Sequence, residues 1–173
     1  MSDKLLAVGS REVDKYNTHA ELYDFDTNKW IVVQDYPFIP LADGGFGYYD
    51  MVYVDSLSAF IVIGGYDTDY QNLAKIAMFH DDTWSPLGQL NTPRRVRVNS
   101  FFRLINCMQQ GHQVQWINDT LIVAGGMADS SMKLSTEVCR FNGTMFACDD
   151  IEPYLGDYYQ GVSFAVGDSY CPR

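Results

Sequence analysis

Four arginines lie within ten residues of a chain that is otherwise strongly acidic. The chain has 12 Lys and Arg against 22 Asp and Glu, which gives a formal net charge of −10. A field of that sign repels a polyanion and argues against a nucleic-acid partner. The local cluster has two interpretations, a solvated surface loop or a binding site for an acidic peptide or a carboxylate. It consists of Arg94, Arg95, Arg97 and Arg103.

The cysteines offer a second kind of chemistry, but their spacing does not favour a metal. None of the four forms a Cys-x-x-Cys pair of the kind that binds zinc. Cys139 and Cys148 flank a predicted hairpin turn. A loop at Gly143-Thr144 would place them directly opposite each other, whereas a loop at Asn142-Gly143 would offset the pair. Because no signal peptide is visible, we expect free thiols in the core.

The remaining motifs predict no catalytic or metal site. The three histidines are scattered and form no His-x-His or His-Glu-x-x-His pattern. The stretch Gly161-Val-Ser163-Phe-Ala165 lacks the last glycine of a nucleophile elbow. Asp67-Thr-Asp69 begins like a calcium loop, but the later glycine and glutamate are missing. We therefore expect no cofactor, no metal and no enzymatic activity.

The elements that must position these residues are predicted to be β-strands. Of the 173 residues, 47% are hydrophobic and 14% are aromatic, with 14 glycines and no long helical pattern. This globular composition is sufficient for one domain with a real core. No apolar stretch is long enough to span a membrane, and the amino terminus lacks the flanks of a signal peptide. We expect an all-β cytoplasmic protein. A longer secreted precursor would instead make the Asn-x-Thr sequons at Asn118 and Asn142 meaningful.

Three segments of the chain repeat one pattern. Each has an apolar strand that ends in two small residues, a loop, a strand with an aromatic residue, a turn, and a strand that opens with Trp or Phe. Glycine permits a positive φ and close backbone approach at the doublets. The aromatic side chains would fill the space between adjacent sheets. The doublets are Gly9-Ser10, Gly64-Gly65 and Gly125-Gly126. The first aromatics are Tyr23, Phe79 and Phe141, and the second are Trp30, Trp84 and Phe146.

One more strand precedes the second and third doublets. These strands cover residues 46–54 and 111–117, and they turn at Asp55-Ser56 and Asn118-Asp119. A full unit is therefore predicted to have four antiparallel strands, which we name a to d. Four-stranded sheets repeated at this spacing are typical of propeller blades.

These features resemble the kelch repeat over nearly the whole chain. The two Gly-Gly doublets, the aromatics and the Trp positions match it, and Leu90-Asn-Thr-Pro-Arg94 resembles the family's link between blades. The chain departs from the pattern at Ser10, Met127 and Phe146. The resemblance implies a kelch-type β-propeller. Such propellers serve in substrate adaptors of ubiquitin ligases, actin-binding scaffolds and extracellular receptors.

Three repeats are fewer than the roughly four to eight blades of a closed propeller. We expect a single partial propeller, which could be a fragment of a longer ring. Two copies could also close a six-bladed ring by pairing residues 158–166 onto blade one, or the chain could be an isolated arc with exposed edges. The predicted boundaries are 1–43 for blade one without strand a, 44–93 for blade two, 94–153 for blade three, and 154–173 for the first strand of a further blade.

The leading prediction is a non-enzymatic module that binds a protein partner, with no nucleic-acid or membrane partner. The alternatives are a scaffold that forms homodimeric rings and a copper enzyme fragment similar to galactose oxidase. Long loops are often functional, and Arg and aromatic residues are common anchors. The resemblance implies binding through the b–c loops 11–18, 66–74 and 127–135 and the d–a loops 35–45, 88–110 and 149–157. The candidate partner-binding residues are Arg94, Arg95, Arg97, Arg103, Tyr66, Tyr70 and Lys133.

Overall fold

A computed structural model describes residues 4–9, 11–12, 15–39, 45–69, 71–95, 113–126 and 136–151, which form an all-β structure. The predicted positions Ser10, Tyr70, Arg97, Arg103 and Lys133, and the predicted strand 158–166, lie outside the described residues. The strands are β1 (Lys4–Val8), β2 (Arg11–Glu12), β3 (Lys15–Tyr16), β4 (Ala20–Asp24), β5 (Lys29–Val32), β6 (Phe46–Gly47), β7 (Asp50–Val54), β8 (Ala59–Ile63), β9 (Tyr66–Asp67), β10 (Lys75–His80), β11 (Thr83–Gln89), β12 (Gln113–Ile117), β13 (Thr120–Ala124), β14 (Thr136–Phe141) and β15 (Phe146–Ile151). A short 3-10 turn, η1 (Asp55–Leu57), joins β7 to β8.

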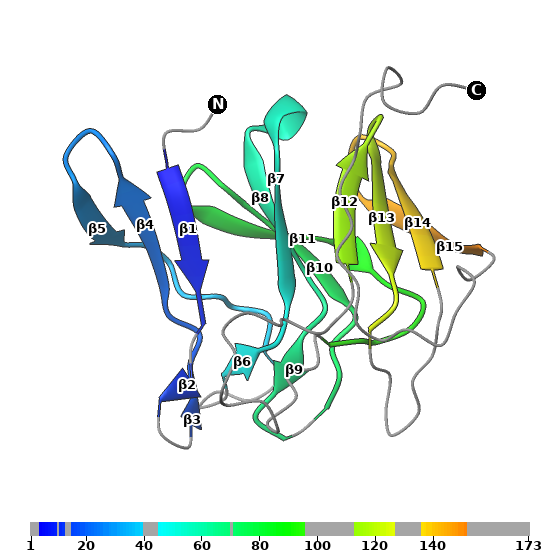
Figure 1. The fold of residues 1–173 in the computed structure, drawn as a ribbon, viewed down its shortest axis with the longest axis horizontal. Coiled ribbons are helices and arrows are strands. Elements are labelled where there is room, and N and C mark those ends of the chain that lie inside the picture. The colour runs from blue at the N-terminus through cyan, green and yellow to red at the C-terminus, as the bar shows by residue number, and fades with distance from the viewer. Residues whose placement is uncertain are drawn as a thin grey trace, which may run out of the picture.

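Three antiparallel sheets stand side by side (Figure 1). Sheet 1 has the strand order β1-β4-β5, sheet 2 has β7-β8-β10-β11, and sheet 3 has β12-β13-β14-β15. In each sheet the strands are paired in the order in which the chain makes them, as the predicted a-to-d unit requires. Two short ribbons, β2-β3 and β6-β9, lie together at the lower end of the sheets in Figure 1. We call this end the loop end.

The core consists of two apolar layers, each between neighbouring sheets. The layer between sheets 1 and 2 contains Leu6, Val8 and Leu22 against Val62, Phe79 and Trp84. The layer between sheets 2 and 3 contains Ile61, Ile63 and Ile76 against Leu121, Val123 and Phe146. Sheet 2 is therefore covered on both faces, so its strands β8 and β10 are almost continuously apolar.

The predicted aromatic pairs lie directly opposite each other on neighbouring strands. Tyr23 pairs with Trp30 in sheet 1, with ring centroids 5.1 Å apart, and Phe79 pairs with Trp84 in sheet 2, at 4.9 Å. Cross-strand aromatic pairs of this kind stabilise a sheet beyond the area that they bury. The repeat read from the sequence is thus reproduced in the register of two sheets.

Sheet 3 departs from this register. Leu121 is opposite Cys139, which is opposite Cys148, so two cysteines occupy the place of the aromatic pair. The aromatic pair Phe141–Phe146 lies two residues nearer the turn, with its centroids 5.2 Å apart. Residues two positions apart on a strand point to the same face, so both pairs lie on the face toward sheet 2.

The glycine doublets have the backbone geometry that the sequence predicts. Gly9, Gly64, Gly65, Gly125 and Gly126 all have a positive φ. At Gly9 (φ +57°), an added Cβ would lie 2.9 Å from the carbonyl oxygen of Phe46. Here the chain leaves sheet 1 and passes close to the strand that enters sheet 2, so glycine is required by both conformation and space.

The predicted strand 46–54 is broken in the structure. Tyr48 has a φ of +55°, which ends β6 after Gly47 and re-aims the chain into β7. As a result β6 pairs with β9 in the loop end, and only β7 pairs within sheet 2.

One predicted burial is wrong, that of Trp30. Its side chain is 48% exposed, whereas Trp84 is 6% exposed and Phe146 is 5% exposed. Trp84 is covered by sheet 1 and Phe146 by sheet 2. The described residues contain no sheet on the outer side of sheet 1, so half of the Trp30 side chain stays exposed beside its neighbour Tyr23.

Candidate interaction surface

Arg94 is a structural residue and not the surface anchor that the arginine cluster suggests. It is 1% exposed, and so neither the solvated-loop interpretation nor the ligand-binding one applies to its side chain. Its Nη1 donates to the carbonyl oxygen of Gly125 at 2.9 Å, and its Nε donates to that of Thr92 at 3.2 Å. Its Nη2 forms a charge-assisted hydrogen bond with Glu137, which is fully buried.

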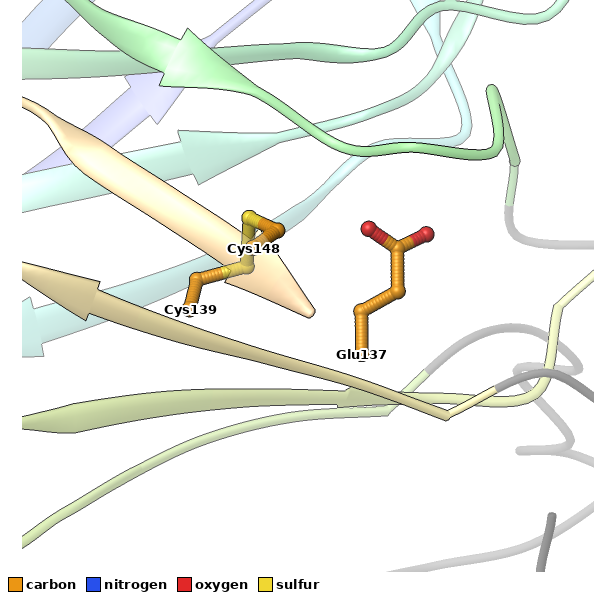
Figure 2. A group of neighbouring side chains, drawn as sticks. All are labelled: Glu137, Cys139 and Cys148. Atoms are coloured by element: carbon orange, nitrogen blue, oxygen red, sulfur yellow. A yellow bond between two sulfur atoms is a disulfide. The ribbon is translucent and has the colours of Figure 1, made fainter. Parts of the chain in front are cut away.

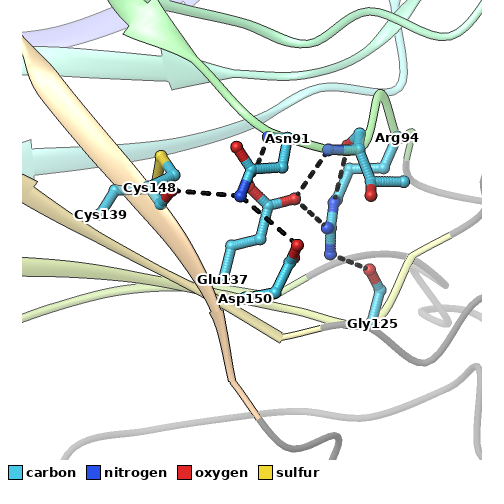
Figure 3. Close-up of polar contacts among 8 residues, drawn as sticks. Asn91, Arg94, Gly125, Glu137, Cys139, Cys148 and Asp150 are labelled. Atoms are coloured by element: carbon cyan, nitrogen blue, oxygen red, sulfur yellow. Dashed lines mark hydrogen bonds and ion pairs between the residues drawn. A yellow bond between two sulfur atoms is a disulfide. The ribbon is translucent and has the colours of Figure 1, made fainter.

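Glu137 is the hub of this network (Figure 3). Its carboxylate accepts hydrogen bonds from the backbone N–H groups of Asn91, at 2.7 Å, and Thr92, at 3.0 Å, as well as from Arg94. The Asn91 side chain donates to the carbonyl oxygen of Cys148 at 3.1 Å. One carboxylate of sheet 3 therefore fixes the segment that leaves sheet 2.

Burial and the neighbouring charge shift the pKa of Arg94 in opposite directions. Desolvation lowers the pKa of its guanidinium, and the adjacent Glu137 carboxylate partly offsets that shift. A guanidinium nevertheless stays protonated in a protein. The pair is therefore a buried ion pair whose donors and acceptors are satisfied by one another and by the backbone.

Arg95, the next residue, has the opposite environment. Its guanidinium carbon lies 3.8 Å from the centroid of the Tyr66 ring, a distance that permits a cation–π contact. Both side chains are half-buried, and Tyr48 adds a second ring 6.1 Å from that of Tyr66. The structure thus brings together Arg95 and Tyr66, two of the predicted binding residues, and adds Tyr48, which the sequence did not single out.

The loop that carries Tyr66 is held in place by hydrogen bonds. Asp67 Oδ1 accepts from the backbone N–H of Gln71 at 2.8 Å, and the N–H of Asp67 donates to the carbonyl of Gln71 at 3.0 Å. Thr68 Oγ1 accepts from the N–H of Gly45 at 2.7 Å. These contacts join the loop after β8 to the segment before β6. We call the group Tyr48, Tyr66 and Arg95 the aromatic–arginine platform.

The described histidines do not meet. His19 lies 3.1 Å from Asp35 at the loop end of sheet 1, and His80 lies 3.2 Å from Asp81 at the opposite hairpin of sheet 2. His112 is outside the described residues. A hollow beside sheet 1 is lined by aliphatic side chains and two carboxylates, which would not attract an acidic ligand. Its lining residues are Leu22, Asp24, Ile31, Val32, Val33 and Asp82.

Asp50 links the inner strands of sheets 2 and 3. Its Oδ2 accepts from the backbone N–H of Val114 at 3.1 Å. Burial raises the pKa of this carboxyl, while the N–H groups of Met51 and Val114 partly offset the shift. The group is therefore a structural contact between β7 and β12.

The expectation of free core thiols is wrong for Cys139 and Cys148, which form a disulfide (Figure 2). The turn decides this outcome. Gly143, with a φ of +95°, and Thr144 form the two-residue loop, so the first of the two predicted registers holds. Asn142 Oδ1 accepts from the N–H groups of Thr144 and Met145, which fixes the turn.

The Glu137 carboxylate and the two cysteine sulfurs lie within 4.8 Å of one another. This is a donor set that a metal could use in another state. Here the sulfurs are bonded to each other, and the carboxylate accepts from Arg94 and two backbone amides. We therefore assign the group a structural role.

Removal of the disulfide should destabilise sheet 3. The C139A/C148A double variant is expected to lose about 2–4 kcal/mol of unfolding free energy, because a cross-link restricts the unfolded chain. Urea titration followed by tryptophan fluorescence measures this loss. A thiol reductant should lower the stability of the native chain by a similar amount and leave the double variant unchanged. Four titratable thiols in the unfolded, unreduced chain would contradict the assignment.

The comparison with solved structures finds a similar fold. No protein-family model matches the chain, and no curated protein matches its sequence. A solved structure described as "Structure of YjhT" aligns with a TM-score of 0.67 over 92% of this chain, at 11% sequence identity. The alignment covers 52% of that protein, so this chain spans about half its length. At this identity the similarity extends to the fold alone.

Within the described ranges, the structure contains no helix long and apolar enough to cross a membrane.

Proposed function

We propose that this chain is a partial kelch-type β-propeller that binds a protein partner through its loop end, without catalysis. Three features support the architecture: the a-to-d strand order of sheets 2 and 3, the positive φ of the glycine doublets, and the aromatic pairs at equivalent positions. The fold similarity to a solved structure about twice as long agrees with a partial ring.

The aromatic–arginine platform is the observation that carries the binding function. Arginine and tyrosine are the residue types that most often anchor protein interfaces. Arg95 already stacks on Tyr66, whose loop is held by the Asp67–Gln71 and Gly45–Thr68 hydrogen bonds. Backbone hydrogen bonds of Arg94 with Gly65 and Leu73 hold the segment that carries Arg95. A partner therefore meets a surface whose ordering cost is small.

The chemistry of the platform favours a carboxylate on the partner. Arginine recognises carboxylates well, because its planar guanidinium matches their geometry and because it also stacks on aromatic faces. The net charge of −10 opposes a highly acidic ligand at long range. We therefore propose a peptide segment with one or two Asp or Glu residues beside an apolar residue, rather than a long acidic run.

A peptide selection tests this site. Random twelve-residue peptides selected on the native chain should be enriched in Asp or Glu, and their affinity for the Arg95→Glu variant should fall at least about tenfold, since a loss of 1.4 kcal/mol is tenfold. Lys29→Glu makes the same change in net charge on an exposed residue of the β4–β5 hairpin. This control should bind the peptides as the native chain does. Selected peptides that bind the Arg95→Glu variant with unchanged affinity would contradict the assignment of the binding site.

The disulfide indicates the redox state of the compartment in which the protein resides. Disulfides form and persist in oxidising compartments and are rare in the reducing cytoplasm. The sequon residues Asn118 and Asn142 are both exposed on hairpin turns, where glycosylation is possible. We therefore propose an oxidising compartment in place of the cytoplasmic location expected from the sequence.

A further inference from the structure

A small hollow opens between the β4–β5 hairpin of sheet 1 and the β10–β11 turn of sheet 2. Its volume is about 180 Å³, and its lining residues are Leu22, Asp24, Ile31, Val32, Val33 and Asp82. Drug-sized ligands occupy roughly 300–1,000 Å³, so this hollow can hold one long side chain but not a larger organic molecule. None of its lining residues belongs to the aromatic–arginine platform.

The apolar part of the lining lies where sheet 2 no longer covers sheet 1. Leu22 and Ile31 lie directly opposite each other on β4 and β5, and they share the face toward sheet 2. Leu22 is 6% exposed, whereas Ile31 is 49% exposed. Val33 is half-buried beside the same apolar layer. An aliphatic chain laid along Ile31 and Val33 would therefore extend this layer and remove apolar surface from water.

Two carboxylates complete the lining, one from each sheet. Asp24 lies on the same face of β4 as the apolar residues, and its Oδ1 accepts from the backbone N–H groups of Asp26, at 2.9 Å, and Thr27, at 3.3 Å. Asp82 is exposed in the β10–β11 turn, and no described residue pairs with its carboxylate. The lining residues include no cation, although Lys29 lies opposite Asp24 in the pairing of β4 with β5. The hollow therefore combines an aliphatic wall with two negative charges.

These features match the side chain of a lysine. Its four-carbon stem packs along apolar surface while its ammonium group stays at the polar rim. The ammonium has three donors, which can reach carboxylates on different sides, whereas the planar guanidinium of arginine best matches a single carboxylate. Asp26 and Asp81, which are exposed on the two adjoining turns, add charge of the same sign. The net charge of −10 also raises the local concentration of cations around the chain.

Exposed apolar residues beside the hollow favour a lysine that belongs to a protein. Val32, which lines the hollow, is 64% exposed, and Trp30, on the same face of β5, is 48% exposed. Phe25, in the hairpin turn before β5, is 59% exposed. A contiguous apolar patch of this kind marks an interaction surface. A protein segment can cover it with the residues that flank the lysine, whereas a free amine leaves it uncovered.

We propose that this hollow binds a lysine side chain of a protein partner. The stem of that lysine packs along Ile31 and Val33, and its ammonium group lies between Asp24 and Asp82. Apolar residues that flank the lysine in the partner cover Val32 and the rest of the exposed patch. Because the hollow and the aromatic–arginine platform share no residue, this site does not depend on the acidic peptide proposed for the platform.

An amide NMR titration of the 173-residue chain tests the site. The acetylated peptide Gly-Leu-Lys-Leu-Gly should shift the amide signals of residues 22–33 and of Asp82, with a dissociation constant in the millimolar range. The same peptide with norleucine, which has the lysine stem without its charge, should bind at least about threefold more weakly. Butylamine should also bind more weakly, because it lacks the flanking apolar residues. Butylamine that binds as tightly as the lysine peptide would assign the hollow to a free amine and overturn the protein partner.

Asp82→Asn removes one charge from the hollow and retains its shape. Asp82 has a φ of +57°, a conformation that asparagine also tolerates, so the variant should fold normally, which circular dichroism checks. It should weaken binding of the lysine peptide about threefold and leave the norleucine peptide unchanged.

Asp81→Asn is the matched control. It makes the same change in net charge in the same turn, but Asp81 does not line the hollow. This variant should bind the lysine peptide as the native chain does. Equal weakening by the two variants, equal affinity for the lysine and norleucine peptides, or the absence of shifts at residues 22–33 and Asp82 would overturn the proposal.

Discussion

The Arg94→Ala variant is expected to lose about 3–5 kcal/mol of unfolding free energy, because it leaves the buried Glu137 carboxylate without its cation. Glu137 is fully buried, so water cannot replace the guanidinium. The same change removes the contact with the carbonyl oxygen of Gly125 and loosens sheet 2 from sheet 3. Urea titration of the variant against the native chain measures the loss.

Arg95→Ala is the matched control for this prediction. The two arginines are adjacent in sequence, but Arg95 is half-buried and stacks on the Tyr66 ring, whereas Arg94 pairs with the buried Glu137. Its replacement should cost less than about 1 kcal/mol. Equal losses at the two positions would contradict the assignment of Arg94 to the core.

A double variant separates the ion pair from the rest of the network. When both partners of a buried pair become apolar, most of the cost usually disappears. Arg94→Met with Glu137→Leu should recover only part of the stability, since the N–H groups of Asn91 and Thr92 also lose their acceptor. Full recovery would mean that those two hydrogen bonds contribute little.

The repeat could be predicted because local chemistry determines it. Asn118 and Asp119 both adopt a positive φ in the two-residue turn between β12 and β13, as their residue types favour. The glycine doublets end strands for the same conformational reason. The break at Tyr48 was missed because tyrosine rarely adopts a positive φ, and nothing local indicates one.

The site was harder to predict because its contacts are distant in sequence. From the sequence alone, Arg94 is predicted to lie on the surface. Its burial becomes clear only from its ion pair with Glu137, which lies in another sheet. A signal was present: Glu137 interrupts an apolar strand next to Val138, and a carboxylate in that setting needs a buried partner. The sequence did not decide whether Cys139 and Cys148 form a disulfide, because two turn registers were possible. Only one of them places the cysteines opposite each other.

Trp84 and Trp30 are the sharpest test of the repeat, since they occupy equivalent positions. The Trp84→Ala variant is expected to lose about 3–5 kcal/mol, the usual cost of removing a buried tryptophan. Its ring packs against Tyr36, with centroids 5.0 Å apart, and its Nε1 donates to the carbonyl oxygen of Gln34 at 2.8 Å. Both partners lie on the segment that leaves sheet 1, so the change loosens sheet 1 from sheet 2.

The same change at Trp30 should have a small effect, less than about 1 kcal/mol, because half of its side chain is already exposed. Thermal unfolding of both variants under the same conditions gives the comparison. Trp84 is covered by sheet 1 and donates a hydrogen bond to Gln34, whereas Trp30 is half exposed beside Tyr23. A Trp30 effect as large as that at Trp84 would show that sheet 1 itself depends on the Trp30 ring.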